Sequence, residues 1–416
     1  MSPKYKILLS AYACEPNKGS EPGVGWNWAL EIVKRGHQVW VLTRKNNQSA
    51  IEKFLIENGK IENLNFIYYD LPKWASFWKK GGHGVHLYYF LWQIGILGLA
   101  KRKHKEYRFD FVHHITFVSI HQPSFLFLLK QVKFFYGPSA GGDLVPKKFL
   151  KSFPFKKRIK ELLLNLQNHL LVYDPLRISM FRASDLIFCN SKQTISFLPK
   201  KQLFKTHLNL AIGTTVNSIT KQKKEANQIF KMLYVGNFLH WKGVHLVLQA
   251  FDKINDLIPS QMTFIGKGNF NELETHSKFG KTIECVKWLP QDKLFELYSD
   301  YDVMIFPSFR DSGGMVVLEA LSHGLPVVCL DLGGPGQIVN ETCGSVIETK
   351  GKSEIEVAQS LADAILELQQ NPLVLEKLRQ GAVQRASEFS WDKTVGRVYD
   401  VIENYMETNR SSITSK

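Results

Sequence analysis

In the first half of the chain, apolar residues come in short runs of strand length, separated by segments with helical periodicity. Residues 6–13 lead into a glycine-rich turn, and the helix predicted next carries Trp26, Ala29 and Val33 on one face before Gly36 ends it. Further strands are predicted at residues 38–43, 64–69, 109–114 and 133–136, and a helix running into a buried strand at 177–190. This alternation predicts an α/β domain with a parallel sheet covered on both faces.

A second series of the same kind fills the other half. Its strands are predicted at residues 231–235, 262–265, 283–286, 303–306, 327–330 and 344–347, and a last helix at 390–405. The polar, lysine-rich stretch between the two series is typical of a linker. The pattern therefore predicts two α/β domains, residues 1–215 and 229–388, joined by a linker at 216–228.

Charge is distributed unevenly between the two series. The 416 residues carry a net charge of +15, with 53 Lys and Arg against 38 Asp and Glu. Residues 1–210 hold 32 of the basic and 13 of the acidic side chains, so the positive excess lies entirely in the first half. Such asymmetry indicates that the first domain faces an anionic partner. Nucleic acid is disfavoured, because no helix-turn-helix, zinc-finger or RNP-type signature accompanies the basic residues.

One basic segment mixes its charges with phenylalanines. Lys147, Lys148, Lys156, Lys157 and Arg158 are interleaved with aromatic and aliphatic side chains, as in segments that lie on anionic membranes. A solvated basic face is the alternative. The apolar stretch 85–100 is shorter than the roughly 20 residues that cross a bilayer. We expect it to form a buried helix, with an interfacial helix as the alternative.

Cysteines and histidines give no metal signature. The five cysteines are widely spaced and form no C-x-x-C pair, which favours reduced thiols in the cytoplasm. Asp300-Tyr301-Asp302 leads directly into a strand, where an aspartate is typical of a cap. His240, His245 and the other scattered histidines lack recognisable ligand spacing. We therefore expect no metal and no cofactor.

The most specific segment is residues 306–334, with the order strand, glycine turn, helix, Gly-Pro break, strand. Asp311 precedes two glycines at the predicted start of the helix, and Glu319 lies eight residues later, about two turns along it. Free N–H groups at a helix start bind phosphates, and a carboxylate two turns on can accept hydrogen bonds from a ribose diol. The predicted anion-binding N–H groups belong to Gly313, Gly314, Met315 and Val316. Asp311 taken alone is equally consistent with a helix cap.

This D-x7-E segment resembles the E-x7-E signature of glycosyltransferase family 4, whose members are retaining enzymes with the GT-B fold. The resemblance implies that Asp311 orients the transferred sugar and that Glu319 binds the nucleotide ribose. Residues 234–251 resemble the family's G-R-x4-K-G segment, which implies that Lys242 neutralises the leaving diphosphate. Asn237 stands where the family has arginine. Further donor-binding positions implied by the resemblance are Gly236, Gly266, Trp288 and Leu289.

Two N-terminal segments extend the resemblance over nearly the whole chain. The CEPxxGSEPGVGW loop resembles that of one bacterial subgroup, which implies a loop for the acceptor and the donor phosphates at Gly19, Ser20, Glu21, Gly23 and Gly25. The doublet His113-His114 ends a strand where the family has a histidine that faces the donor, and either imidazole fits that role. A role in the core, or in supporting the site from behind, is the alternative for either histidine.

The resemblance thus implies two Rossmann-like domains facing each other across a cleft, with part of 389–416 crossing back as a helix onto the first. It implies a hexosyltransferase that uses a nucleotide diphosphate sugar, with acceptor attack on the face from which the diphosphate leaves. We expect a lipid-linked glycan acceptor, in bacterial surface polysaccharide or glycolipid synthesis, and a cytoplasmic protein peripheral at the inner face of the cell membrane. The alternatives are a sugar-nucleotide epimerase, a phosphorylase-like enzyme, or a non-catalytic carbohydrate-binding scaffold.

Overall fold

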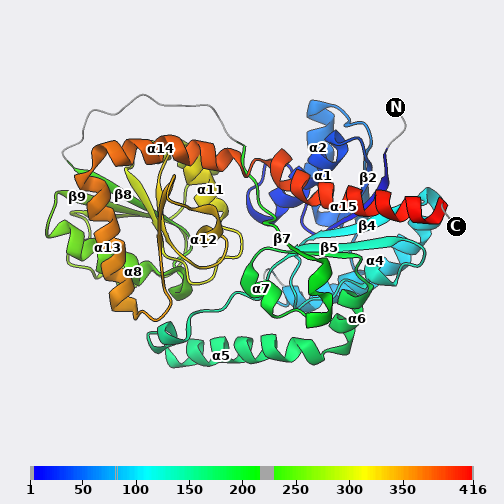
Figure 1. Cartoon of the computed structure of the whole chain (residues 1–416), viewed down its shortest axis with the longest axis horizontal. Helices are drawn as coiled ribbons and strands as arrows, with labels where there is room; N and C mark the ends of the chain where they lie inside the picture. Colours follow the sequence, from blue (N-terminus) through cyan, green and yellow to red (C-terminus); the bar gives the residue numbers. More distant parts are fainter. Residues whose placement is uncertain (1–3, 80, 82, 216–228, 415–416) are drawn as a thin grey trace. The chain divides into compact units, whose positions relative to one another are not determined.

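The computed structural model describes residues 4–79, 81, 83–215 and 229–414. Its contacts divide the chain into two compact units, which Figure 1 shows as two α/β bodies. The N-terminal unit comprises residues 1–142, 166–211 and 391–416, and the C-terminal unit comprises 143–165 and 212–390. Residues 143–165, expected in the first domain, therefore pack with the second series. The predicted linker 216–228 lies outside the described residues.

The N-terminal unit is built on a seven-stranded parallel sheet with strand order β3-β2-β1-β4-β5-β6-β7. Its strands are β1 (Lys6–Ala11), β2 (Gln38–Arg44), β3 (Leu64–Tyr69), β4 (Phe111–Thr116), β5 (Lys133–Ser139), β6 (Leu186–Cys189) and β7 (Thr206–Leu208). The sequence pattern did not predict β7, because its three residues are too few to show a period.

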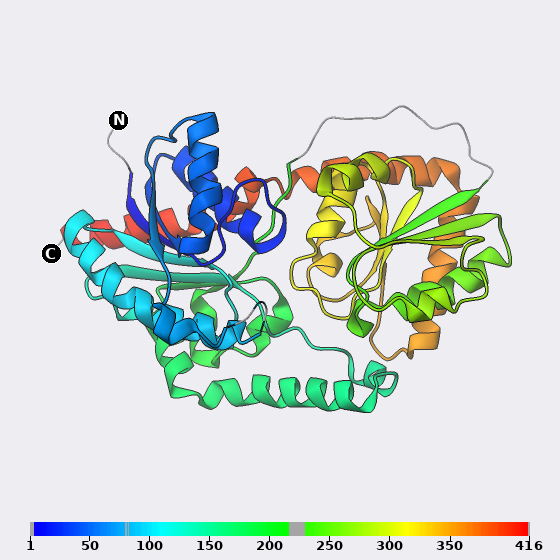
Figure 2. The ribbon, with the colours of Figure 1, turned by 180° about the vertical axis from the view of Figure 1, so that it is seen from behind.

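Helices of the N-terminal unit include the last one of the chain. They are α1 (Ser20–Lys34), α2 (Gln48–Asn58), α3 (Lys73–Ser76), α4 (Val85–Tyr107), α6 (Pro175–Ala183), α7 (Lys192–Ser196) and α15 (Trp391–Thr414). Helix α4 buries Tyr89, Trp92 and Ile96 completely, as expected for the apolar stretch 85–100. Helix α15, red in Figure 2, packs beside α1, where Glu403 pairs with Arg35 at 2.9 Å. The expected return of the C-terminal helix to the first domain is confirmed.

The C-terminal unit has a six-stranded parallel sheet with strand order β10-β9-β8-β11-β12-β13. Its strands are β8 (Phe230–Val235), β9 (Ser260–Ile265), β10 (Ile283–Val286), β11 (Val303–Phe306), β12 (Val327–Leu330) and β13 (Gly344–Ile347). Its helices are α8 (Val244–Asn255), α9 (Asn271–Glu274), α10 (Gln291–Tyr298), α11 (Met315–Ser322), α12 (Pro335–Ile338), α13 (Glu354–Gln370) and α14 (Pro372–Ser387). The last four strands have the predicted bounds.

One helix contributes to both units. Helix α5 (Phe155–Leu170) begins in the C-terminal unit and ends in the N-terminal unit, after the short 3-10 helix η3 (Lys147–Lys151). None of the helices in the described part of the chain has the length and hydropathy that a membrane crossing requires.

Candidate functional site

The strand order of each sheet marks one place where ligands bind. In sheets of this kind the order reverses beside the first strand, and ligands bind at the carboxyl ends of the strands on either side of that point. In the C-terminal unit these strands are β8 and β11, which are neighbours in the sheet. Lys242 lies after β8 and Asp311 after β11, and Lys242 Nζ is 2.6 Å from Asp311 Oδ2. The fold thus joins two predicted site residues that are 69 positions apart.

Asp311 is fully engaged by the protein. Its Oδ1 accepts hydrogen bonds from the N–H groups of Gly313 at 3.2 Å and Gly314 at 2.9 Å, while Oδ2 pairs with Lys242. Asp311 therefore closes the turn that precedes α11, whose own N-cap is Gly314 without a side-chain cap bond, so Asp311 is not the helix cap of the alternative interpretation. Two of the four N–H groups predicted to bind an anion already have a protein acceptor, so the prediction of four free groups is wrong for Gly313 and Gly314.

Glycines around this turn allow backbones to approach closely. Gly314 has φ +79°, a left-handed conformation that favours glycine. A Cβ on Gly333 would lie 2.1 Å from the carbonyl oxygen of Asp311, and one on Gly334 would lie 2.2 Å from that of Gly313. The loop after β12 thus packs directly on the turn, and Gly334 N–H donates to Asp311 O at 2.7 Å. This packing holds the turn in place.

Glu319 lies further along α11 and is 9% exposed. Its Oε1 accepts a hydrogen bond from Gln291 Nε2 at 2.7 Å. Burial raises the pKa of the Glu319 carboxyl to about 7, and the bond from Gln291 opposes this only in part. Gln291 was missed in the sequence, where its only signal is that it follows the predicted Trp288-Leu289 segment.

The remaining predicted donor residues surround the same sheet edge. A Cβ on Gly266 would lie 1.9 Å from Gly236 O, so the loops after β9 and β8 touch there. Asn237 is exposed, as is Trp288, over whose ring Lys267 Nζ lies at 5.2 Å. Three further members of this set are partly exposed: Leu289, Met315 and Val316. Their contacts with a donor stay predictions.

The glycine loop of the N-terminal unit opens α1. A Cβ on Gly23 would lie 2.0 Å from Lys18 O, and one on Gly25 would lie 2.1 Å from Ala13 O. Both glycines are buried, so they serve the packing of α1 on its own preceding loop. Gly19 is the N-cap of α1, and Ser20 and Glu21 are exposed. Glu21 Oε2 accepts the Phe117 N–H at 3.0 Å, next to the carboxyl end of β4.

Both candidate histidines lie inside the N-terminal unit and are 0% exposed. His113 contacts the Tyr399 hydroxyl through Nδ1 at 3.2 Å and Gly137 O through Nε2 at 2.8 Å. His114 contacts Ser10 Oγ at 2.9 Å and the Tyr89 hydroxyl at 2.8 Å. Burial lowers the pKa of each imidazole to about 3. In this structure neither faces outward, contrary to the expectation that one of them faces a donor, and a catalytic role stays a prediction.

The predicted membrane residues form two groups. Lys147 and Lys148 lie in η3, where Lys148 Nζ donates to Gly351 O. Lys156, Lys157 and Arg158 lie in the first turn of α5, with the two lysines exposed and Arg158 half-buried. None of these residues is a long-range ion-pair partner in the described part of the chain.

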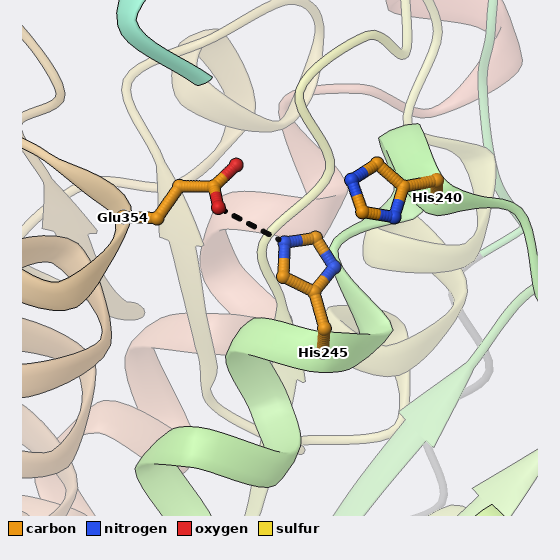
Figure 3. A group of neighbouring side chains, drawn as sticks. All are labelled: His240, His245 and Glu354. Carbon is orange, nitrogen blue, oxygen red and sulfur yellow. Dashed lines mark ion pairs between the residues drawn. The ribbon is translucent and has the colours of Figure 1, made fainter. Parts of the chain in front are cut away.

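A cluster that the sequence did not reveal lies beside Lys242. The rings of His240 and His245 stack at 4.3 Å with an interplanar angle of 4°, and His245 Nε2 is 3.6 Å from Glu354 Oε2 (Figure 3). Ser152 Oγ contacts both His240 Nε2, at 2.9 Å, and Glu354 Oε1, at 2.7 Å. Burial, and then the neighbouring His245, lower the pKa of His240 to about 4.

His240, His245 and Glu354 each offer one metal-ligand atom, and these atoms lie within 4.8 Å of one another. A metal ion approaches an imidazole nitrogen in the plane of the ring, at about 2.0–2.1 Å for zinc. Because the two rings are parallel and stacked, their lone pairs do not converge on one point. The cluster instead joins Ser152, which precedes α5, to the start of α8 and α13.

Comparisons with known proteins agree with this topology. Residues 216–388 match the family model described as glycosyl transferases group 1. The chain is 27% identical over 184 residues to a D-inositol 3-phosphate glycosyltransferase of Corynebacterium urealyticum, covering 40% of this chain and 41% of that protein. The chain thus spans well under half the length of the first curated relatives it matches.

Solved structures are similar over nearly the whole chain. The sucrose-phosphate synthase of Thermosynechococcus elongatus superposes with a TM-score of 0.67 at 17% identity, covering 97% of this chain and all of that one. WaaG, a glycosyltransferase involved in lipopolysaccharide biosynthesis, gives a TM-score of 0.59 at 14% identity, covering 95% and 99%. The fold is therefore GT-B, with two Rossmann-like units, and the family match falls within the range of the C-terminal unit.

Proposed function

We propose that this protein is a retaining glycosyltransferase that moves a hexose from a nucleotide diphosphate sugar to a glycan acceptor. The observation that carries the proposal is the set Lys242, Asp311 and Glu319 at the reversal point of the C-terminal sheet. A cation suited to a diphosphate and a buried carboxylate suited to a ribose diol lie on segments that leave neighbouring strands. The family match over residues 216–388 supports this assignment.

Lys242 is the group that neutralises the leaving diphosphate in this proposal. Its ammonium is held by Asp311 at 2.6 Å, and both side chains are about one-fifth exposed. A diphosphate then approaches a cation that is already positioned, which favours charge stabilisation in the transition state. Asp311 acts chiefly by positioning Lys242 and by closing the turn before α11. The family resemblance adds that Asp311 orients the transferred sugar.

The acceptor is proposed to be lipid-linked, in bacterial surface polysaccharide or glycolipid synthesis, with the protein peripheral at the inner face of the cell membrane. The positive excess of residues 1–210 supports an anionic surface or lipid phosphate as the partner of the N-terminal unit. The involvement of WaaG in lipopolysaccharide biosynthesis is consistent with an acceptor of this kind. No metal or other cofactor enters the proposed reaction.

A thermal-shift panel of nucleoside diphosphates and their sugars tests donor binding. A donor at about 100 times its Kd adds about 2.7 kcal/mol of apparent stability, so one base should raise Tm by several degrees. Glu319→Ala should abolish this shift, whereas Glu284→Ala, at an exposed position of β10, should keep it. Slow release of free sugar from the stabilising donor would then show turnover. A panel without any shift would overturn the proposal, and binding without turnover would favour a scaffold.

A further inference from the structure

Helix α5 carries its large apolar side chains on the outside. Six of them are between 40% and 67% exposed: Phe155, Ile159, Leu162, Leu163, Leu166 and Leu170. At about 100° per residue, these six positions fall within an arc of about 100° on the helix surface. A single helix therefore presents a continuous apolar row, which we call the α5 row, to its surroundings.

The inward side of α5 is polar, the reverse of an ordinary surface helix. Glu161 is buried and pairs with Arg310 Nη1 at 2.8 Å in the C-terminal unit. Asn168 is 0% exposed and donates to Gly141 O at 3.3 Å in the N-terminal unit. Turning the helix to bury its leucines would break both contacts. The outward direction of the row is thus built into the packing.

Apart from the buried Glu161, the charges on α5 are all positive. Lys156, Lys157, Arg158 and Lys160 occupy the first turns, and the only acidic residue of the helix is the buried Glu161. On the helix surface, Lys156 and Arg158 lie on either side of the α5 row, about 70–90° from its centre. Cations that border an apolar stripe match the arrangement of helices that lie in the plane of an anionic membrane.

We propose that the α5 row inserts into the headgroup region of an anionic lipid membrane, with α5 parallel to the surface. The apolar side chains enter the boundary between headgroups and acyl chains, while the bordering cations contact lipid phosphates. Tyr173, which is 78% exposed just beyond the helix, adds an aromatic group of the kind enriched at membrane interfaces. This inference specifies the membrane contact of the proposed function but does not rest on sugar transfer.

Charge favours lipid over a second copy of the chain as the occupant. Two copies meeting through the α5 row would bring two sets of four cations together without an exposed acid on either helix. Like charges at an interface disfavour association. An anionic bilayer supplies the opposite charge and the apolar environment together.

The test is co-sedimentation with vesicles of 30% phosphatidylglycerol in phosphatidylcholine. Leu162→Ser/Leu163→Ser should lower the partition coefficient at least tenfold, because both side chains are more than 49% exposed and their loss leaves no core cavity. The matched control is Leu373→Ser/Val374→Ser on α14, whose side chains are 81% and 45% exposed and whose binding should equal that of wild type. Lys156→Gln/Arg158→Gln, which removes the two cations that border the α5 row, should lower binding to these vesicles but not to pure phosphatidylcholine.

Three further measurements separate the outcomes. Circular dichroism should show every variant folded, and the donor-induced thermal shift should be unchanged by the α5 substitutions, so loss of membrane binding is distinct from failure of the proposed function. Sedimentation velocity without lipid should give a monomer. Wild-type binding by the leucine variant would overturn the proposal, as would a dimer that the leucine substitutions dissociate.

Discussion

Replacing Glu319 by Gln should make the protein more stable at high pH and bind its donor less well. The carboxyl is buried against α10 and its pKa is raised to about 7 from an ordinary 4.5. In the unfolded chain it ionises near pH 4.5, whereas the folded protein keeps the proton until about pH 7. The contribution of Glu319 to wild-type stability therefore falls as pH rises through this window.

The size of the effect follows from the two pKa values. The folded state bears an ionisation penalty of about 3 kcal/mol above pH 7 and almost none below pH 4.5. A glutamine is uncharged throughout and still accepts the hydrogen bond from Gln291. Glu319→Gln should therefore match wild type near pH 4.5 and exceed its free energy of unfolding by about 2–3 kcal/mol at pH 8.

Donor affinity should rise with pH, whereas the contribution of Glu319 to stability falls. If the ionised carboxylate accepts the ribose hydroxyls, about one-eleventh of the protein is competent at pH 6 and about nine-tenths at pH 8, a tenfold difference in affinity. A nucleotide sugar is the right titrant, because its diphosphate lacks the free terminal group that titrates near pH 6. Calorimetry from pH 6 to 8 should show this rise in wild type and a flat, weaker profile in Glu319→Gln.

Two results would refute this reasoning. One is a Glu319→Gln variant whose denaturant midpoint tracks that of wild type at both pH 5 and pH 8, which would mean that the carboxyl is not desolvated. The other is an unchanged donor affinity and pH profile in the variant, which would remove Glu319 from the ribose site while leaving the stability argument intact.

Three other predictions concern charge. Lys242→Met should lower kcat by about 100-fold or more, because the leaving diphosphate loses its stabilising cation. The measurement is kcat with one donor, and an unchanged kcat would remove this lysine from the mechanism. His113 and His114 stay neutral when folded but protonate below pH 6.5 when unfolded, so together they should lower stability by about 4 kcal/mol from pH 7 to pH 5. This is read from urea midpoints in the Glu319→Gln background, where the opposing contribution of Glu319 is absent, and a flat profile there would contradict their burial. Burial opposes ionisation of Glu403, but Arg35 and Lys4 outweigh it and lower the pKa of this carboxyl to about 2. Glu403→Gln should therefore lower the free energy of unfolding by about 2–3 kcal/mol above pH 5, and the difference from wild type should close toward pH 2.

Much of the sheet architecture was readable from local pattern. Residues 283–286, 303–306, 327–330 and 344–347 are short apolar runs bounded by turns, and each forms a strand with those bounds. Such runs are typical of strands in a parallel sheet covered on both sides, because both of their faces are buried. The D-x7-E spacing likewise predicted the helix of Glu319, because capping and helical period are properties of neighbouring residues.

Other features depend on partners that are distant in sequence. Residues 143–165 pack with the C-terminal unit through Phe149 and Phe153, which contact Phe309. Gln291 meets Glu319 only because α10 and α11 lie on adjacent segments of the folded unit. A periodic pattern reveals which residues share a face, but not what that face will meet.

The α5 row shows this division most clearly. The sequence by itself indicated a basic segment interleaved with apolar side chains and the two chain-wide α/β series, since composition and period are local quantities. Only the tertiary structure decided that Glu161 and Asn168 face inward and the leucines outward, because that choice depends on Arg310 and Gly141, which lie far along the chain. The same holds for Asp311. One of its carboxylate oxygens pairs with Lys242, 69 residues away, and the other accepts hydrogen bonds within the turn that follows it.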